Sequence, residues 1–347
     1  MGFLERWGVE KITFFYEREA KKKRGCPQRV NTLFLSTSLG LFTFLAFMVG
    51  FVMTLPIIYV EVEYGVFAWE QFNSDIVLAY LLLFVLFVFL EFYLLFLLGF
   101  YLLAKELHHI VCFYHQHHTL SLKEQPFLAM LVRTIMELPE PQVKRYAIDH
   151  RIHFKQERHL FLWTLLYKVK VIMTNLVLKF IAKRVLTRTS LRIYTPYISA
   201  VGTALWDGIV FYKTLQESHY KIVVRLAIEM LYERKHHLLK KEAYWRVLLA
   251  RYLYYGEYHH NLEYLIDKLS LEQSRLGEVE SFVDSKWLFE VDRGYVILLY
   301  AFKALPLNKK EKEVLEHLGV LEEFKALKEA FKKADISTIE ALIDALP

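Results

Sequence analysis

The chain has 347 residues, a net charge of +6 and an apolar composition. Hydrophobic residues make up 55% of it, aromatic residues 16%, and the mean hydropathy is +0.23, whereas soluble domains contain about 45–50% apolar residues. Charged residues still reach 24%, more than a protein made only of membrane-spanning helices would carry. The composition excludes a disordered chain, a collagen-like repeat and a disulfide scaffold, and it predicts a bilayer part joined to a large water-facing part.

Residues 1–29 are predicted to form an amphipathic helix with a basic end. Its apolar residues include Phe3, Trp7, Phe14 and Phe15. A helix of this kind lies in the plane of the membrane interface, and its basic residues contact anionic headgroups. The candidate headgroup-binding residues at its end are Lys21, Lys22, Lys23 and Arg24.

Two long apolar stretches follow, at residues 30–60 and 76–104. The first contains no charged residue, and the second is interrupted only by Glu91. About 20 apolar residues are enough for a helix to cross a bilayer, whereas a signal peptide has an apolar region of only about 7–15 residues. The sequence therefore predicts a transmembrane hairpin over residues 30–104.

The flanking charges predict how this hairpin is oriented. Positive residues gather before the first stretch, whereas the loop at residues 61–75 contains four acidic residues and no Lys or Arg. Under the positive-inside rule the loop faces outward and both termini face the cytoplasm. We therefore expect a protein of the cytoplasmic (inner) membrane, surrounded by anionic headgroups.

Residues 105–239 are expected to form a helical region close to the membrane. Residues 160–192 are apolar with repeated cations, and residues 193–212 contain a single charge, that of Asp207. A third crossing by 193–212 would move the C-terminal region outside, and the basic flanks on both sides oppose that. A buried or half-inserted hairpin over 160–212 is the preferred interpretation. Its candidate headgroup-binding residues are Lys179, Lys183 and Arg184.

A family resemblance covers residues 160–235. The stretch PYISAVGTALWDGIVFYKTLQESHYKIVVRLAIEMLYER is similar to the closing part of EcsC-like bacterial membrane-associated domains. Pro196, Gly202 and Ala204 match the family pattern, whereas Asp207 stands where the family usually has Asn. The resemblance implies a helical protein on the cytoplasmic side of the membrane, without an established catalytic centre.

Residues 240–347 have a helical pattern throughout and are predicted to form a cytosolic domain of helical hairpins. Residues 242–269 look like one tetratricopeptide unit, with Gly256 at the turn and Asn261 where the motif has Ala. Stacked hairpins offer a surface to a protein partner, and an ordinary all-α domain is the alternative. The candidate partner-surface residues are Trp245, Tyr252 and Tyr258.

The histidines raise the question of a metal. His108, Cys112 and His115 have the spacing that places three side chains on one helix face. Imidazole and thiolate are ligands that zinc prefers, and Glu106 with His109 forms a Glu-x-x-His pair of the kind found in di-iron bundles. Histidine also suits a membrane interface, because its side chain has an apolar body and a polar tip. We predict no cofactor and keep a metal as the alternative.

Glu91 lies in the middle of a predicted membrane span. A charged carboxylate costs several kcal/mol at this depth, so an intramembrane acid suggests an ion or proton pathway. The alternative is a structural role, with a protonated carboxyl or one bonded to a neighbouring helix. Asp207 has the same two interpretations, and it can also face water at the interface.

The function is predicted to be non-catalytic, because the sequence contains no GxxxxGK[ST], GxGxxG or GxSxG motif. The positive charges lie beside apolar segments, so lipid rather than nucleic acid is the expected anion. The preferred hypothesis is an all-α membrane protein whose cytosolic domain binds a partner or organises the membrane surface. The alternatives are a homo-oligomeric channel or transporter with Glu91 facing its axis, and a metal-dependent membrane-bound enzyme.

Overall fold

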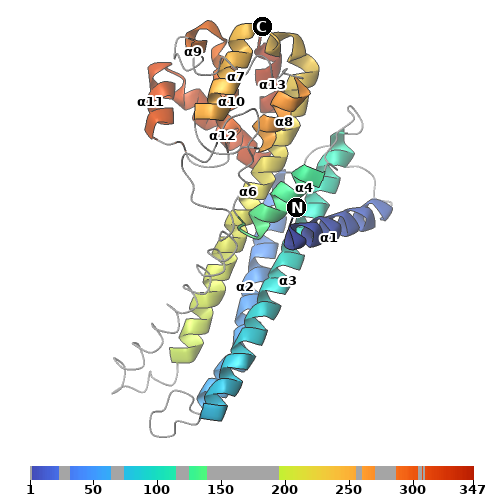
Figure 1. Ribbon diagram of the computed structural model, residues 1–347, viewed down its shortest axis with the longest axis vertical. Coiled ribbons are helices and arrows are strands. Elements are labelled where there is room, and N and C mark those ends of the chain that lie inside the picture. Colours follow the sequence, from blue (N-terminus) through green and yellow to red (C-terminus); the bar gives the residue numbers. More distant parts are fainter. Residues whose placement is uncertain are drawn as a thin grey trace.

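The computed structural model describes residues 2–22, 32–63, 74–114, 125–138, 195–254, 260–269, 287–303, 307 and 309–347. All regular secondary structure within these ranges is helical, which confirms the predicted all-α class. Figure 1 shows an elongated bundle of helices at one end of the molecule and a compact group of short helices, the head, at the other.

The bundle is formed by α2 (Thr32–Glu63), α3 (Ser74–Tyr114) and the first half of α6 (Thr195–Leu239). Two of these helices are long and apolar enough to cross a membrane, over Leu39–Val60 and Asp75–Ile110. The two long apolar helices predicted at residues 30–60 and 76–104 are therefore present, and α3 continues beyond its predicted end.

Helix α6 runs without a break from the bundle into the head (Figure 1). Only Lys235 has non-helical backbone angles, with φ −130° and ψ 24°. Residues 195–212 are thus the first part of a long helix that continues past residue 212. The other arm of the hairpin predicted over 160–212 lies outside the described residues.

Small residues explain the close packing of α6 on α2. A β-carbon added to Gly50 would lie 3.3 Å from the Cα atom of Ala204, and one added to Gly208 would lie 3.6 Å from the backbone oxygen of Thr43. Residue numbers fall along α2 as they rise along α6, so the two helices are antiparallel. Their backbones approach closely because both helices carry small residues at four-residue spacing. These residues are Ala46, Gly50 and Thr54 on α2, and Ala200, Ala204 and Gly208 on α6.

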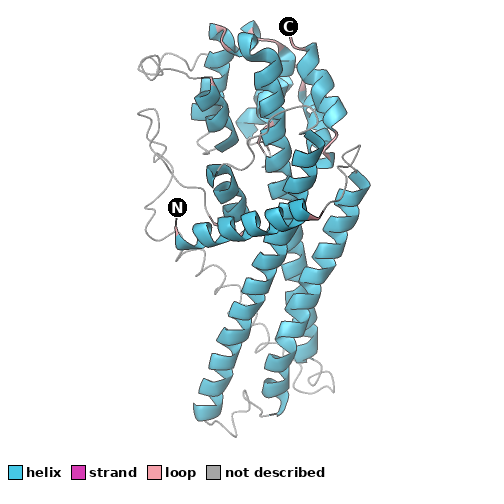
Figure 2. Ribbon diagram, turned by 90° about the vertical axis from the view of Figure 1, so that its right-hand side faces the viewer, coloured by secondary structure: helices cyan, strands magenta, loops and turns pink. Residues whose placement is uncertain are grey.

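Helix α1 (Phe3–Lys21) lies across the bundle at the level where the head begins (Figure 2). The ring of Trp7 packs on Tyr93 and Phe100, with centroids 5.8 and 5.5 Å away. Glu5 accepts a hydrogen bond of 2.8 Å from Nε of Arg133 on α4 (Gln125–Ile135). Burial alone would raise the pKa of Glu5, but Arg133 holds that pKa below its usual value. A helix is thus present over Phe3–Lys21, whereas residues 23–29 of the predicted basic end lie outside the described residues.

The head packs around the second half of α6, whose apolar residues form its centre. Helices α7 and α8 correspond to the two arms of the hairpin predicted at 242–269, and they contact one another. The head helices are α7 (Glu242–Tyr254), α8 (His260–Lys268), α9 (Trp287–Glu290), α10 (Arg293–Ala301), α11 (Lys309–His317), α12 (Leu321–Lys333) and α13 (Ile336–Ala345).

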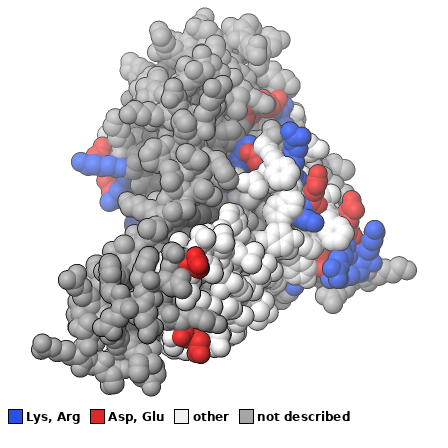
Figure 3. Space-filling view, turned by 60° about the horizontal axis from the view of Figure 1, so that its bottom comes forward, with Lys and Arg blue, Asp and Glu red and all other residues white. Residues whose placement is uncertain are grey.

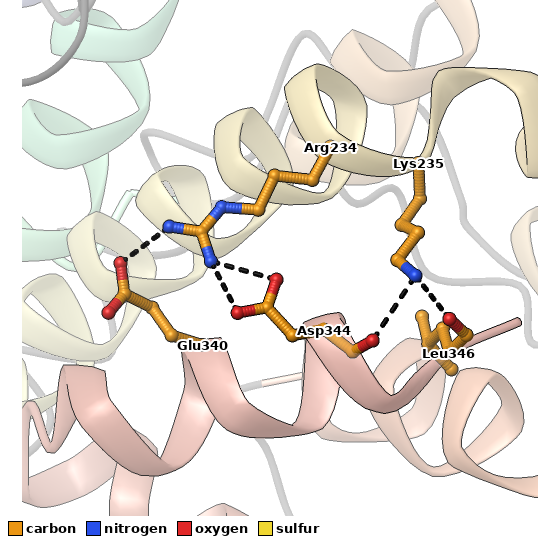
Figure 4. Close-up of polar contacts among 5 residues, drawn as sticks. All are labelled: Arg234, Lys235, Glu340, Asp344 and Leu346. Atoms are coloured by element: carbon orange, nitrogen blue, oxygen red, sulfur yellow. Dashed lines mark hydrogen bonds and ion pairs between the residues drawn. The ribbon is translucent and has the colours of Figure 1, made fainter.

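A polar clamp fastens α13 to α6 (Figure 4). Nη1 of Arg234 donates to both carboxylate oxygens of Asp344 at 2.9 Å, and Nη2 donates to Glu340 at 2.9 Å. Nζ of the next residue, Lys235, donates to the backbone carbonyl oxygens of Asp344 and Leu346. The C-terminal helix is thereby held at the point where α6 leaves helical geometry.

We expect Arg234→Ala to lower the free energy of local opening of α13 by about 1 kcal/mol, which is the usual contribution of a partly exposed ion-pair network. Backbone hydrogen exchange measured residue by residue should accelerate in α13 and remain unchanged in α1. Lys312→Ala, which removes an exposed partner of Glu316, serves as the control and should leave α13 exchange unchanged. Equal exchange in Arg234→Ala and in the unaltered protein would show that the clamp contributes nothing.

Candidate functional site

The structure brings together Glu91 and Asp207, the two acidic residues predicted to lie at membrane depth. Glu91 on α3 and Asp207 on α6 are joined by a side-chain hydrogen bond. A β-carbon on Gly50 of α2 would lie 2.6 Å from Oδ2 of Asp207 and 3.4 Å from Oε1 of Glu91. The acidic pair therefore sits where three helices meet, and it needs a glycine at position 50.

The chemistry of this pair follows from its residue types. Ionised carboxylates only accept hydrogen bonds, so two carboxyl groups can bond to one another only when one carries a proton. Two ionised carboxylates in contact would also repel strongly in an apolar environment. The apolar stretches at 39–60, 76–104 and 197–212 contain no other Asp or Glu and no Lys or Arg. The arrangement can therefore hold and release a proton.

The acidic pair is surrounded by a bundle whose outer surface is apolar. On the face displayed in Figure 3, the white central surface is mostly uncharged and carries a few acidic residues, and the Lys and Arg side chains lie around it rather than on it. Even the half of α6 that carries Asp207 exposes large apolar side chains. These are Tyr197, Val201, Leu205, Trp206, Ile209 and Tyr212.

A second polar pair joins the same two helices nearer the head. Nδ1 of His219 on α6 is hydrogen bonded to the Glu106 carboxylate on α3, and both side chains are buried. Between the two pairs, Phe211 of α6 packs beside Gly99 of α3. Helices α3 and α6 thus run in parallel with a fixed register, and polar contacts mark both ends of the shared stretch.

Buried polar residues continue along one face of α6 toward the head. Asp207 is followed at intervals of seven, four, seven and four residues by Thr214, Ser218, Arg225 and Glu229, all buried. These intervals keep the side chains on one face of the helix. The Arg225 guanidinium lies over the Tyr264 ring of α8, and Tyr264 and Lys268 donate hydrogen bonds to Glu229.

The described residues do not assemble the predicted metal ligands. His108 packs against the ring of Tyr16, with centroids 5.7 Å apart. The side chain of Cys112 and the whole of His115 lie outside the described part of the chain. Within the described part, no three His, Cys, Asp or Glu side chains are grouped so that they could hold a metal ion. The metal site stays a prediction.

Few of the predicted headgroup-binding residues fall in the described ranges. Lys21 is exposed at the end of α1, and Lys22 forms an ion pair with Glu19. Burial would raise the pKa of Glu19, but Lys22 holds that pKa below its usual value. The remaining candidates lie outside the described residues, and they are Lys23, Arg24, Lys179, Lys183 and Arg184.

The prediction that Trp245 belongs to a partner surface is wrong. Its side chain is only 4% exposed and lies in the core of the head. The tetratricopeptide-like pattern marks positions where helices pack against one another, so its aromatic residues fill the interior. The side chain of Tyr252 and the whole of Tyr258 lie outside the described residues.

Sequence reasoning missed Gly50 and the Glu106–His219 pair. The spacing of Ala46, Gly50 and Thr54 was a usable signal for Gly50, because small residues every four positions favour a close helix contact. No comparable signal pointed to His219, since its partner is 113 residues away in the chain.

Comparison with protein-family models, curated proteins and solved structures gave no match to this chain. The similarity of residues 160–235 to EcsC-like domains therefore stays a prediction. The functional argument rests on the geometry of the site and on the arrangement of the helices.

We expect Gly50→Ala to destabilise the bundle by about 1–3 kcal/mol, the usual effect of overpacking a close contact. The new β-carbon would meet Oδ2 of Asp207 and the Ala204 backbone. Thermal unfolding in detergent measures the effect. Gly40→Ala is the matched control on the same helix, because its β-carbon meets no atom within 4 Å. An equal response of the two variants would refute the close contact.

Proposed function

We propose that this chain is an integral membrane protein whose head acts at the cytosolic surface as a non-catalytic binding module for a protein partner. The observation that carries the proposal is the position of α1, which lies across the bundle at the level where the head begins (Figure 2). An interfacial helix at this level places the apolar bundle in the bilayer and the head in water.

The side chains of α1 and of the bundle support this placement. Phe3 and Phe14 of α1 are 82% and 58% exposed, as suits residues that enter the headgroup region. Helices α2 and α3 also expose large apolar residues along their lengths, among them Phe44, Leu82 and Phe89. Soluble proteins rarely expose apolar surface of this extent. Anionic lipid at the basic end of α1 completes the interface.

The proposed topology includes α6 as a crossing helix. The first half of α6 runs antiparallel to α2 and has the same apolar exterior. With the head in the cytosol, Glu63 at the end of α2 and Thr195 at the start of α6 lie on the outer side of an inner membrane. With an even number of crossings in all, the N-terminal helix and the C-terminus both lie on the cytosolic side, as the charge distribution predicts.

The arrangement of the head favours a partner held close to the membrane. Because α6 enters the head as one continuous helix, the head has a fixed position over the bundle rather than a flexible tether. A partner bound by the head is then presented to the bilayer surface at a defined height. This geometry suits a module that recruits a protein or organises the membrane surface.

The topology can be tested by labelling single cysteines in spheroplasts with a membrane-impermeant maleimide, after replacing Cys26 and Cys112 by Ser. Cysteines at Glu63 and Tyr197 should react in intact spheroplasts. A cysteine at Ser337, which is exposed on α13, should react only after lysis. Protection of the cysteine at Tyr197 until lysis would show that α6 does not cross the membrane.

A second candidate function is proton conduction, and the Glu91–Asp207 contact favours it. The initial hypothesis placed Glu91 on the axis of an oligomer. In the structure Glu91 instead faces Asp207 within one chain, at the junction of α2, α3 and α6. A pathway through this pair would lie inside each bundle and would not need a symmetric oligomer.

For this second candidate, proton flux into liposomes containing the purified protein is the measurement. Glu91→Gln and Asp207→Asn should each reduce the flux to that of empty liposomes, because neither amide can release a proton at neutral pH. Asp75→Asn, at the exposed start of α3, is the control and should conduct normally. Unchanged flux in correctly folded Glu91→Gln would remove the pathway and leave the pair a structural role.

A further inference from the structure

A run of basic residues lies where α6 ends and α7 begins. Residues 234–241 read RKHHLLKK and contain no acidic residue. The two leucines of this run are fully buried in the core of the head, so they anchor the segment. The polar residues that follow Lys235 are exposed to solvent. We call them the basic turn, and they are His236, His237, Lys240 and Lys241.

The basic turn has a fixed backbone. The amide of Lys240 donates to the carbonyl oxygen of His236 at 3.2 Å, and the amide of Trp245 donates to the carbonyl oxygen of Lys241 at 3.2 Å. Just before the turn, Arg234 and Lys235 are bonded to α13 (Figure 4). The exposed cations are therefore carried by a segment that is hydrogen bonded on both sides, and a partner would not have to order it.

The lysines of the basic turn differ from four other exposed lysines of the head. Each of those four pairs with a glutamate on its own helix, and the pairs are Lys309–Glu313, Lys312–Glu316, Lys325–Glu322 and Lys332–Glu329. By contrast, Lys240 and Lys241 form no ion pair with any residue that the structure describes. The nearest acidic residue after the turn, Glu242, pairs with Arg246. The positive charge of the turn is thus left uncompensated by the described surface around it.

The requirements of the fold do not account for this charge. The C-terminal end of a helix favours a cation, because its carbonyl groups carry partial negative charge. Arg234 and Lys235 already lie near the end of α6, and both are engaged by α13. Two further lysines side by side repel one another rather than stabilise the helix end. A concentrated charge of one sign on a rigid surface is typical of a site for an oppositely charged partner.

The position of the basic turn indicates which partner fits. The contacts of Lys235 with Asp344 and Leu346 place the turn beside the C-terminus, at the end of the head farthest from the bundle (Figure 1). In the proposed topology this end faces the cytosol and not the bilayer, which excludes lipid headgroups of the same membrane. The described head helices also expose no large apolar side chain. Recognition by this part of the head therefore depends on charge.

We propose that the basic turn binds an acidic segment of a cytosolic protein. Glutamate and aspartate side chains accept charge-assisted hydrogen bonds from the ammonium groups of Lys240 and Lys241, and the neighbouring imidazoles of His236 and His237 supply further N–H donors. A nucleic acid fits less well, because it requires a longer basic groove lined with aromatic rings. The inference rests on the proposed function, since it names the chemistry of the partner that the head binds.

The test is binding of a fluorescein-labelled dodecapeptide of alternating Glu and Ser, with blocked ends, to the full-length protein in neutral detergent. Fluorescence anisotropy should show saturable binding that weakens as salt is added. The same peptide with Gln in place of Glu should not bind. Replacing both lysines, as Lys240→Gln with Lys241→Gln, should weaken binding about tenfold or more, because two charged hydrogen-bond donors are lost.

The matched control is Lys309→Gln with Lys312→Gln. It removes the same number of charges from exposed side chains of α11, and it should bind the peptide like the unaltered protein. Absence of binding to the unaltered protein, or an equal loss of affinity in the two double variants, would overturn the proposal. Displacement of the peptide by an equimolar 20-nucleotide single-stranded DNA would overturn it in favour of a nucleic-acid site.

Photo-crosslinking in intact cells separates this inference from the proposed function. A benzophenone amino acid is placed at Glu242, beside the basic turn, or at Lys309 on α11. We expect a cross-link from Glu242 to an acidic segment, mapped by mass spectrometry, that is lost when Lys240 and Lys241 are replaced by Gln. A protein cross-linked from Lys309 but not from Glu242 would overturn this inference alone. No cross-linked protein from either position would count against the proposed function itself.

Discussion

The contact between α6 and α2 at Gly50 is the constraint on which the rest of the structure depends. Because Gly50 has no side chain, the α6 backbone approaches α2 closely at Ala204. The same approach places Asp207 beside Glu91, and it fixes the register that brings His219 to Glu106. Since α6 then continues into the core of the head, one helix contact sets the geometry of the acidic pair and the position of the head.

The polar face of α6 carries an energetic cost that its neighbours offset. Thr214 and Ser218 donate to backbone carbonyls of their own helix, so their hydroxyls are satisfied without a partner from another element. Arg225 and Glu229 lie farther along, where α8 supplies the Tyr264 ring and the Lys268 ammonium group. Buried charges are tolerated only with such compensation. The polar face therefore favours one arrangement of the head on α6 over apolar packings that would leave these groups unsatisfied.

Much of this architecture could be predicted from the sequence, and the limits have physical causes. The apolar runs at 30–60 and 76–104 predicted two long helices, because a run of this length has few other stable forms. The structure of residues 193–212 was harder to predict, since the flanking charges opposed a third crossing. The continuity of α6 to Leu239 also depends on tertiary packing, which the local sequence does not reveal. Glu91 and Asp207 were each recognised as unusual, but their contact depends on helix register. Trp245 was misassigned because a packing signature does not distinguish an interior aromatic residue from an exposed one.

The two proposed functions involve the same helix, α6. If the proton between Glu91 and Asp207 is lost, two like charges face one another in an apolar environment, and the repulsion acts between α3 and α6. Asp207 is already packed closely against α2, because a β-carbon on Gly50 would lie 2.6 Å from its Oδ2 atom. The helix that carries Asp207 continues as far as Lys235, inside the head. There the Arg234 clamp joins α6 to α13. Asp207 of the acidic pair and the centre of the head therefore belong to one helix.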